Sequence, residues 1–180
     1  MSPALFLDRD DTLIRDVPYL HQPDLIVPLP GAAQALALAR EAGYLLFLFT
    51  NQSGINRGYF NLQSAIRCCR ETAKRLGLQP GPSGFCEICI APELPEEKPV
   101  YRKPSPRFIL EAIQRYHIQV ENSWMIGDRD SDLACGRAAG LRVAQIQPPT
   151  RPSSNQNSGF PSLLDFVLQE IASPGLGSKD

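Results

Sequence analysis

Short apolar runs alternate along the chain with longer segments of helical periodicity. Apolar runs that fit buried strands cover residues 4–7, 44–49, 85–90, 123–126 and 142–146. Segments that fit amphipathic helices cover residues 32–42, 62–76, 106–117, 133–139 and 160–171. Because strands alternate with helices, the pattern predicts an α/β fold with a mainly parallel sheet and helices on both faces.

The ends of these segments support the same interpretation. Gly43 and Gly77 stand where a helix C-cap is expected, and the run after Gly43 is almost wholly apolar, as in a strand covered on both faces. Residues 147–159 are rich in Pro, Ser and Asn and predict a loop. We therefore expect a single domain over residues 1–172, followed by a mobile tail over residues 173–180.

Polar side chains gather where the predicted strands end. The carboxyl ends of parallel strands share one edge of a sheet, so these clusters can converge. Two carboxylates about 4 Å apart repel by about 4 kcal/mol at an effective dielectric constant of 20, so a cation is expected among them, most simply a divalent one. The clusters are Asp8, Asp10, Asp11 and Thr12, then Thr50 and Asn51, then Arg102 and Lys103, and finally Asp128 and Asp132.

Composition narrows the class of ligand. The 180 residues carry a formal charge of −1, with Lys and Arg scattered, which argues against a nucleic-acid or anionic-membrane surface. The five cysteines are odd in number and no secretion signal is visible, so we interpret them as reduced thiols of a cytoplasmic protein. No apolar stretch approaches the roughly 20 residues needed to cross a bilayer. A small soluble ligand is expected, and a monomer.

The converging clusters fit phosphoryl transfer, which needs a nucleophile, an acid and base, a cation and donors around the phosphoryl oxygens. In this respect the chain resembles the haloacid dehalogenase (HAD) superfamily of phosphatases over residues 4–146. The resemblance implies a Rossmann-like three-layer α/β/α sandwich with a minimal cap. It also implies that Asp8 is the nucleophile, Asp10 the general acid and base, Thr50 a phosphoryl ligand and Lys103 the neutralising cation. Mg²⁺ would be held by Asp8, Asp128 and the backbone carbonyl of Asp10, with Asp132 in support.

Longer motifs sharpen this resemblance. Residues 6–10, 19–24, 50–60 and 102–104 are similar to those of the D-glycero-D-manno-heptose 1,7-bisphosphate phosphatases and the related histidinol phosphatases. The match around residues 19–21 and 53–60 favours the heptose branch, whereas the Gly-Asp-Arg sequence at 127–129 also occurs in the histidinol branch. The resemblance implies a phosphorylated sugar as substrate, contacted by His21, Asn51, Arg57 and Arg102.

Two departures from this family are visible. Asp11 stands where Gly is usual, which predicts an added carboxylate near the leaving group. Of the four ligands of the family's zinc loop only Cys89 is present, because the other positions hold Ala91, Pro99 and Tyr101. Zinc is therefore not expected.

Three other functions stay open on the sequence. A histidinol-phosphate phosphatase belongs to the related branch, which also has the Gly-Asp-Arg sequence. A nucleic-acid 3′-phosphatase would share a similar Thr-Asn-Gln-x-Gly-Ile stretch but would normally show a basic face. A degenerate phospho-ligand binding module would keep the cluster without turnover, yet it would not need Asp10.

Overall fold

The computed structural model describes residues 1–81, 84–147 and 159–172. Its centre is a five-stranded sheet in the order β3-β2-β1-β4-β5, in which every neighbouring pair is parallel. The register places Leu7 of β1 beside Leu48 of β2 and Ile126 of β4, so these strands end at one edge. The strands are β1 (Ala4–Leu7), β2 (Leu45–Asn51), β3 (Glu87–Ala91), β4 (Trp124–Gly127) and β5 (Arg142–Gln145).

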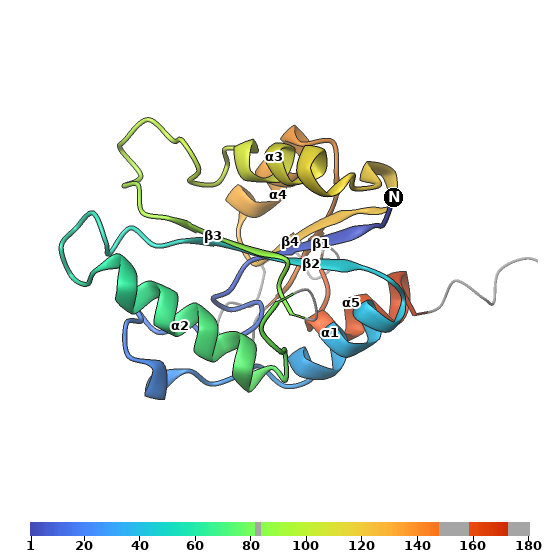
Figure 1. Cartoon of the computed structure of the whole chain (residues 1–180), viewed down its shortest axis with the longest axis horizontal. Helices are drawn as coiled ribbons and strands as arrows, with labels where there is room; N and C mark the ends of the chain where they lie inside the picture. The colour runs from blue at the N-terminus through green and yellow to red at the C-terminus, as the bar shows by residue number, and fades with distance from the viewer. Residues whose placement is uncertain (82–83, 148–158, 173–180) are drawn as a thin grey trace, which may run out of the picture.

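Helices cover both faces of this sheet and form three layers (Figure 1). One face is covered by α1 (Ala32–Glu41), α2 (Leu62–Arg75) and α5 (Leu163–Glu170), and the other by α3 (Arg107–Tyr116) and α4 (Asp130–Ala138). Short 3-10 turns occur at Pro23–Leu25 and Val120–Asn122. This is the Rossmann-like α/β/α sandwich that the sequence predicts.

Each face of the sheet has its own core, because successive strand side chains point to opposite faces. On the α3 and α4 side, Phe6 stacks on Phe47 with ring centroids 4.7 Å apart, and Phe108 of α3 meets both rings edge-on. On the opposite side, Phe166 of α5 lies edge-on to Trp124 at 4.9 Å. The sheet is therefore held firmly from both sides, and with it the edge where the polar clusters lie.

Two helices differ from their predicted starts, and side-chain caps explain both. α4 begins at Asp130 instead of residue 133, because the Asp132 carboxylate accepts a hydrogen bond from the Arg129 N–H and closes an earlier turn. α5 begins at Leu163 instead of residue 160, where the Ser162 hydroxyl accepts from the Asp165 N–H.

The segments that could carry a cap are small. Between β1 and α1, and between β3 and α3, the described chain forms only loops and one 3-10 turn, which fits a minimal cap. Most of the predicted loop at 147–159 and the predicted tail at 173–180 lie outside the described residues. None of the helices in the described part has the length and apolar character to span a membrane.

Candidate active site

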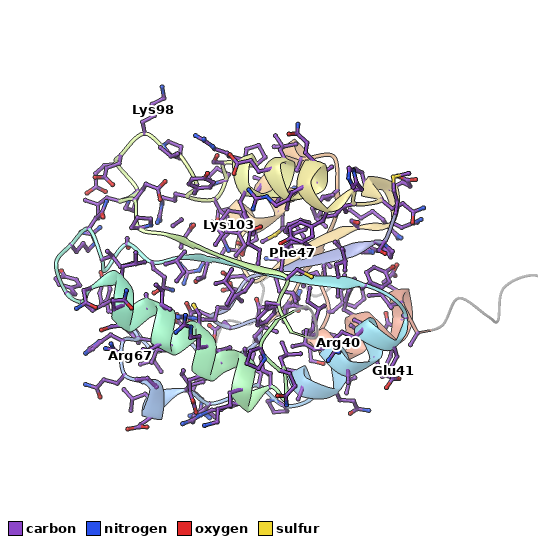
Figure 2. The ribbon with its side chains drawn as sticks, in the orientation of Figure 1. Arg40, Glu41, Phe47, Arg67, Lys98 and Lys103 are labelled. Carbon is purple, nitrogen blue, oxygen red and sulfur yellow. The ribbon has the colours of Figure 1, made fainter. Side chains whose placement is uncertain are left out.

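Lys103 is the centre of the polar cluster. Its ammonium nitrogen lies 2.6 Å from Asp8 Oδ1 and 2.6 Å from Asp132 Oδ1, and it donates to the Phe49 carbonyl at 2.8 Å. The side chain is 2% exposed and lies close to the sheet (Figure 2). Burial alone would lower the pKa of Lys103, but the carboxylates of Asp132 and Asp8 outweigh it and raise the pKa well above its usual range. Lys103 is therefore a permanent cation.

The carboxylates around Lys103 come from two neighbouring strands. Asp8 follows β1, and its N–H donates to the Ile126 carbonyl at 2.9 Å, which continues the pairing with β4. Asp132 lies in the first turn of α4, directly after β4. Gly127 leaves room for it, because a Cβ at that position would lie 2.2 Å from Asp132 Oδ2. The tight turn from β4 into α4 thus fixes Asp132 against the ammonium group.

A second arrangement of carboxylates lies in the same place. Asp8, Asp128 and Asp132 are all buried, and each offers an oxygen within 4.8 Å of the others. Hard divalent cations such as Mg²⁺ prefer oxygen ligands of this kind. The donor set therefore fits such a cation, with Asp8 facing both it and Lys103.

Asp10 is held separately from Asp8, although only one residue lies between them. Arg9 forms a two-point ion pair with it, Nε to Oδ1 and Nη2 to Oδ2, both at 3.0 Å. Gln52 donates to Asp10 Oδ2 at 3.1 Å and to Thr50 Oγ1 at 2.8 Å. Burial raises the pKa of Asp10 and the Asp8 charge adds to the effect, while Arg9 opposes it, so the pKa is raised overall. Its protonated form is favoured relative to an ordinary aspartate.

Asn51 connects β2 to the segment that carries Lys103. Its Oδ1 accepts from the Lys103 N–H at 3.0 Å, and its Nδ2 donates to the Lys103 carbonyl at 3.3 Å. The amide side chain thus bonds the backbone of Lys103 on both sides, as a neighbouring strand would. This fixes the position from which the lysine side chain reaches Asp8.

An open cavity of about 360 Å³ lies over the cluster. Its floor includes Asp8, Asp10 and Lys103, and its walls come from residues 16–20, from the segment after β2, and from two arginines, Arg102 and Arg129. The Arg129 guanidinium lies 3.6 Å from Asp16, which also lines the cavity. Burial lowers the pKa of Arg102, the nearby Glu93 opposes this, and the positive charges of Arg129 and Arg57 lower it further. The cavity thus presents both guanidinium groups and carboxylates to a ligand.

The chain is similar over nearly its whole length to known phosphatases. A D-glycero-beta-D-manno-heptose-1,7-bisphosphate 7-phosphatase of Helicobacter pylori (strain ATCC 700392 / 26695) is 36% identical over 174 residues, covering 92% of this chain and 98% of the relative. This chain belongs to the heptose-bisphosphate phosphatase family of HAD phosphatases. As a HAD phosphatase it is a phosphoric monoester hydrolase.

Further comparisons agree with membership of this HAD phosphatase family. The relative of the same description from Pasteurella multocida (strain Pm70) is 32% identical, covering 96% of this chain and 94% of its own. A family model described as "HAD-hyrolase-like" matches residues 100–148. A putative HAD-like phosphatase from Mesorhizobium loti has a TM-score of 0.75 at 30% identity, covering 99% of this chain and 90% of that one.

One more solved structure shares the fold of this HAD phosphatase. It is a D,D-heptose 1,7-bisphosphate phosphatase from B. bronchiseptica, crystallised with magnesium and phosphate, with a TM-score of 0.77 at 24% identity. The structural match covers 93% of this chain and 97% of the B. bronchiseptica chain.

Most site residues that the sequence predicts for this HAD phosphatase lie together. Asp8, Asp10, Asn51, Arg102 and Lys103 line the cavity. Thr50 is buried beneath it, and Asp128 belongs to the buried group of carboxylates.

Two predicted substrate contacts lie outside the cavity lining. His21 is exposed, its ring stacks on Phe60 at 5.8 Å, and its Nδ1 lies 2.9 Å from the Tyr19 carbonyl. Arg57 is exposed in the loop after β2. Their roles as substrate contacts remain predictions.

Asp11, where the resemblance leads us to expect Gly, lies in a tight turn. Its φ is +56°, in the left-handed region where Asp is among the few non-glycine residues found with any frequency. The side chain is 3% exposed, and its Oδ1 accepts from the Asp16 N–H at 3.0 Å. Asp11 thus closes the turn that leads to the cavity wall.

Three residues that contribute to the site were not predicted from the sequence. Arg9 and Gln52 hold Asp10, and Arg129 lines the cavity. A signal for Gln52 was available, because it directly follows Thr50 and Asn51 in the polar cluster where the strand ends. Asp132, expected only in support, contacts Lys103 directly.

Proposed function

We propose that this HAD phosphatase hydrolyses a heptose bisphosphate in a Mg²⁺-dependent reaction that passes through an aspartyl-phosphate on Asp8. The observation that carries the proposal is the position of Lys103, whose ammonium group lies 2.6 Å from the carboxylate of Asp8 at the floor of an open cavity. A carboxylate nucleophile cannot approach a phosphate dianion without such a cation. The heptose substrate comes from the description shared by the relatives.

Each group has a role in this proposal. Asp8 attacks phosphorus, and the bond from phosphorus to the ester oxygen breaks as the new bond forms. Thr50 accepts a hydrogen bond from Gln52, which leaves its own hydroxyl proton to donate to a phosphoryl oxygen. Lys103 neutralises charge on Asp8 and on the phosphoryl group.

Asp10 is the general acid and base. Its raised pKa favours the protonated form, from which a proton passes to the departing ester oxygen. The resulting carboxylate then takes a proton from the water that attacks phosphorus and releases Asp8. Arg9 and Gln52 hold the carboxylate in one place through both steps.

The metal would be held by Asp8, Asp128 and the backbone carbonyl of Asp10. Bound there, Mg²⁺ would supply positive charge to the phosphoryl oxygens and to the nucleophile. This metal site is supported by the buried group of Asp8, Asp128 and Asp132. Each of the three offers a carboxylate oxygen that lies within 4.8 Å of the others.

The test is phosphate release from a panel of esters with Mg²⁺ or EDTA. The panel contains heptose 1,7-bisphosphate, histidinol phosphate, simple sugar phosphates and 3′-phosphorylated DNA. We expect the heptose bisphosphate to be the best substrate, EDTA to abolish turnover, and Asp10→Asn to lower kcat by about 10²- to 10⁴-fold. The exposed Asp24→Asn is the matched control and should keep wild-type activity. Faster turnover of another ester would show that the heptose bisphosphate is not the preferred substrate. Full activity in EDTA would exclude a Mg²⁺-dependent reaction.

A further inference from the structure

The loop between β3 and Lys103 is closed by one carboxylate, that of Glu93. Its Oε1 accepts from three consecutive backbone N–H groups, those of Val100, Tyr101 and Arg102, at 3.1, 2.6 and 3.3 Å. The Glu93 carbonyl also accepts from Arg102 Nη1 at 3.1 Å. The Glu93 carboxylate therefore bonds the backbone of Arg102, while the main-chain carbonyl, which any residue at this position would keep, bonds its guanidinium group.

The three N–H groups form a compact anion-binding site, and the anion that they bind is the carboxylate of Glu93. Successive N–H groups that point at one oxygen stabilise a negative charge, and bonds to an ionised acceptor are stronger than neutral ones. Among the described residues, Glu93 Oε2 is one of the few buried side-chain oxygens without a hydrogen-bond partner. The hydrogen bonds of the carboxylate to the loop are thus made by Oε1.

Arg102 and Lys103 are held by different partners, although they are neighbours. The Glu93 carboxylate holds the backbone of Arg102, whereas Asn51 holds the backbone of Lys103 on both sides, and Asp8 and Asp132 hold its ammonium group. Loss of the Glu93 side chain should therefore disturb Arg102 much more than Lys103. Arg102 is one of the residues that line the cavity.

We propose that Glu93 is a positioning residue whose carboxylate fixes the backbone turn that carries Arg102, so that the Arg102 guanidinium can bind a substrate phosphate other than the one being transferred. The proposal rests on the proposed function, because it needs a substrate with two phosphates. Glu93 touches no reacting atom and acts only through Arg102.

The kinetic test compares Glu93→Ala, Glu93→Gln, Arg102→Ala and the double variant Glu93→Ala/Arg102→Ala. For heptose 1,7-bisphosphate we expect Glu93→Ala to raise KM about tenfold, which is about 1.4 kcal/mol of binding, with kcat within about threefold of wild type. For p-nitrophenyl phosphate, which has no second phosphate, KM should stay within about twofold. Glu93→Gln keeps one acceptor oxygen and should fall between wild type and Glu93→Ala.

The double variant decides whether Glu93 acts through Arg102. Adding Glu93→Ala to Arg102→Ala should change kcat/KM by less than about twofold, because the group that Glu93 positions is already gone. Glu96→Ala is the control, since Glu96 is an exposed acid of the same loop. The proposal would be overturned if the losses of kcat/KM in the two single variants multiplied in the double variant. An equal rise of KM in Glu96→Ala, or a fall in kcat for both substrates in Glu93→Ala, would overturn it too.

Hydrogen exchange separates this proposal from the proposed function. In Glu93→Ala the amides of residues 100–102 should lose protection, while in Glu96→Ala they should keep it. If the wild-type protein turns over no bisphosphate, the proposed function fails and the exchange still reports on the loop. Unchanged protection in Glu93→Ala would overturn the role of Glu93 whatever the substrate.

Discussion

Arg9 is the largest of the fully buried side chains in the described structure, with 1% exposure. A cation in such a place is tolerated only when its charge is compensated by a partner. Asp10 provides this partner through two bonds of 3.0 Å, and the Arg9 Nη1 lies 4.0 Å from the Cys69 sulfur. The same pair holds the general acid of the proposed mechanism. At this point, stability and chemistry depend on one contact.

Replacing Arg9 should therefore affect both properties. Arg9→Met keeps most of the buried volume but leaves the Asp10 carboxylate without its cation, so we expect the free energy of unfolding to fall by about 3 kcal/mol at pH 7. Urea denaturation measures it. Arg70→Met, at an exposed position on α2, should change stability by less than about 0.5 kcal/mol. Equal stability of Arg9→Met and wild type would contradict the role assigned to the ion pair.

Gly127 permits a second close contact, with Asp132. In Gly127→Ala the new Cβ would lie 2.2 Å from Asp132 Oδ2, so the carboxylate must move away from the Arg129 N–H and from Lys103. We expect destabilisation of about 1–3 kcal/mol and a loss of kcat of at least about tenfold, measured by thermal melting and phosphate release.

The control for Gly127→Ala is Gly140→Ala, which introduces backbone strain at a φ of +80° without crowding Asp132. It precedes β5, at the edge of the sheet opposite the site, and should lose about 1 kcal/mol of stability while keeping kcat. A Gly127→Ala variant with normal kcat would show that Asp132 is dispensable.

Among the elements, the carboxyl end of β2 organises most of the site. Gln52, directly after the strand, donates to both Asp10 and Thr50, and Asn51 bonds the Lys103 backbone. The end of one strand thus places Asp10 and Lys103 relative to each other. The loop closed by Glu93 is the second such element, since it delivers Arg102 to the cavity wall.

The loop closed by Glu93 should depend on pH. Burial would raise the pKa of Glu93, but hydrogen bonds from the Tyr101, Arg102 and Val100 backbone outweigh it, so the pKa is lowered from its ordinary 4.5. A carboxyl with a lowered folded pKa stabilises the protein above pH 4.5, and this contribution is lost as pH falls through the folded value.

The measurement is the difference in unfolding free energy between wild type and Glu93→Gln as pH varies. We expect about 1–2 kcal/mol at pH 7, shrinking steadily below about pH 4.5, because protonation makes the wild-type side chain neutral as well. Glu96→Gln should show no such trend. A difference that stays constant down to pH 3 would exclude a charged Glu93 as the closing group.

Periodicity and strand-end chemistry predicted the sheet, the helix layers and most of the cavity floor, because those features depend on local sequence. What escaped prediction depends on side-chain contacts that only the folded chain shows. Arg9 reads as an ordinary polar residue until the structure places it in the core. In the sequence, Glu93 is one of several acids of a loop. Only the structure shows that three N–H groups from residues 100–102 bond its carboxylate. Likewise, the start of α4 moved to Asp130 because the Asp132 side chain caps the helix.

In the whole molecule, part of the core lies far from the polar cluster. Phe166 packs on Trp124, the first residue of β4, whereas the polar cluster lies at the opposite ends of the strands. α5 packs on α1 and closes this core with Phe166 and Val167, both fully buried. The terminal helix therefore supports the sheet without reaching the cavity.

Truncation of Phe166 should accordingly reduce stability and spare catalysis. We expect Phe166→Ala to lower the free energy of unfolding by about 3–5 kcal/mol, with kcat unchanged at temperatures well below its melting point. Trp124 fluorescence reports the unfolding, since the two rings are in contact. Leu110→Ala, at a 43% exposed position on α3, should be nearly neutral. A selective loss of kcat in folded Phe166→Ala would show that α5 influences the site.

The loop that leads to Arg102 is fastened at both ends, by Glu93 at its base and by Asn51 beyond it, while Lys98 projects from its far tip (Figure 2). Residues between the two fastened ends can therefore be inserted, deleted or exchanged without displacing Lys103 from Asp8. Such a division lets the length and sequence of this loop drift during evolution while the ion pair is inherited unchanged.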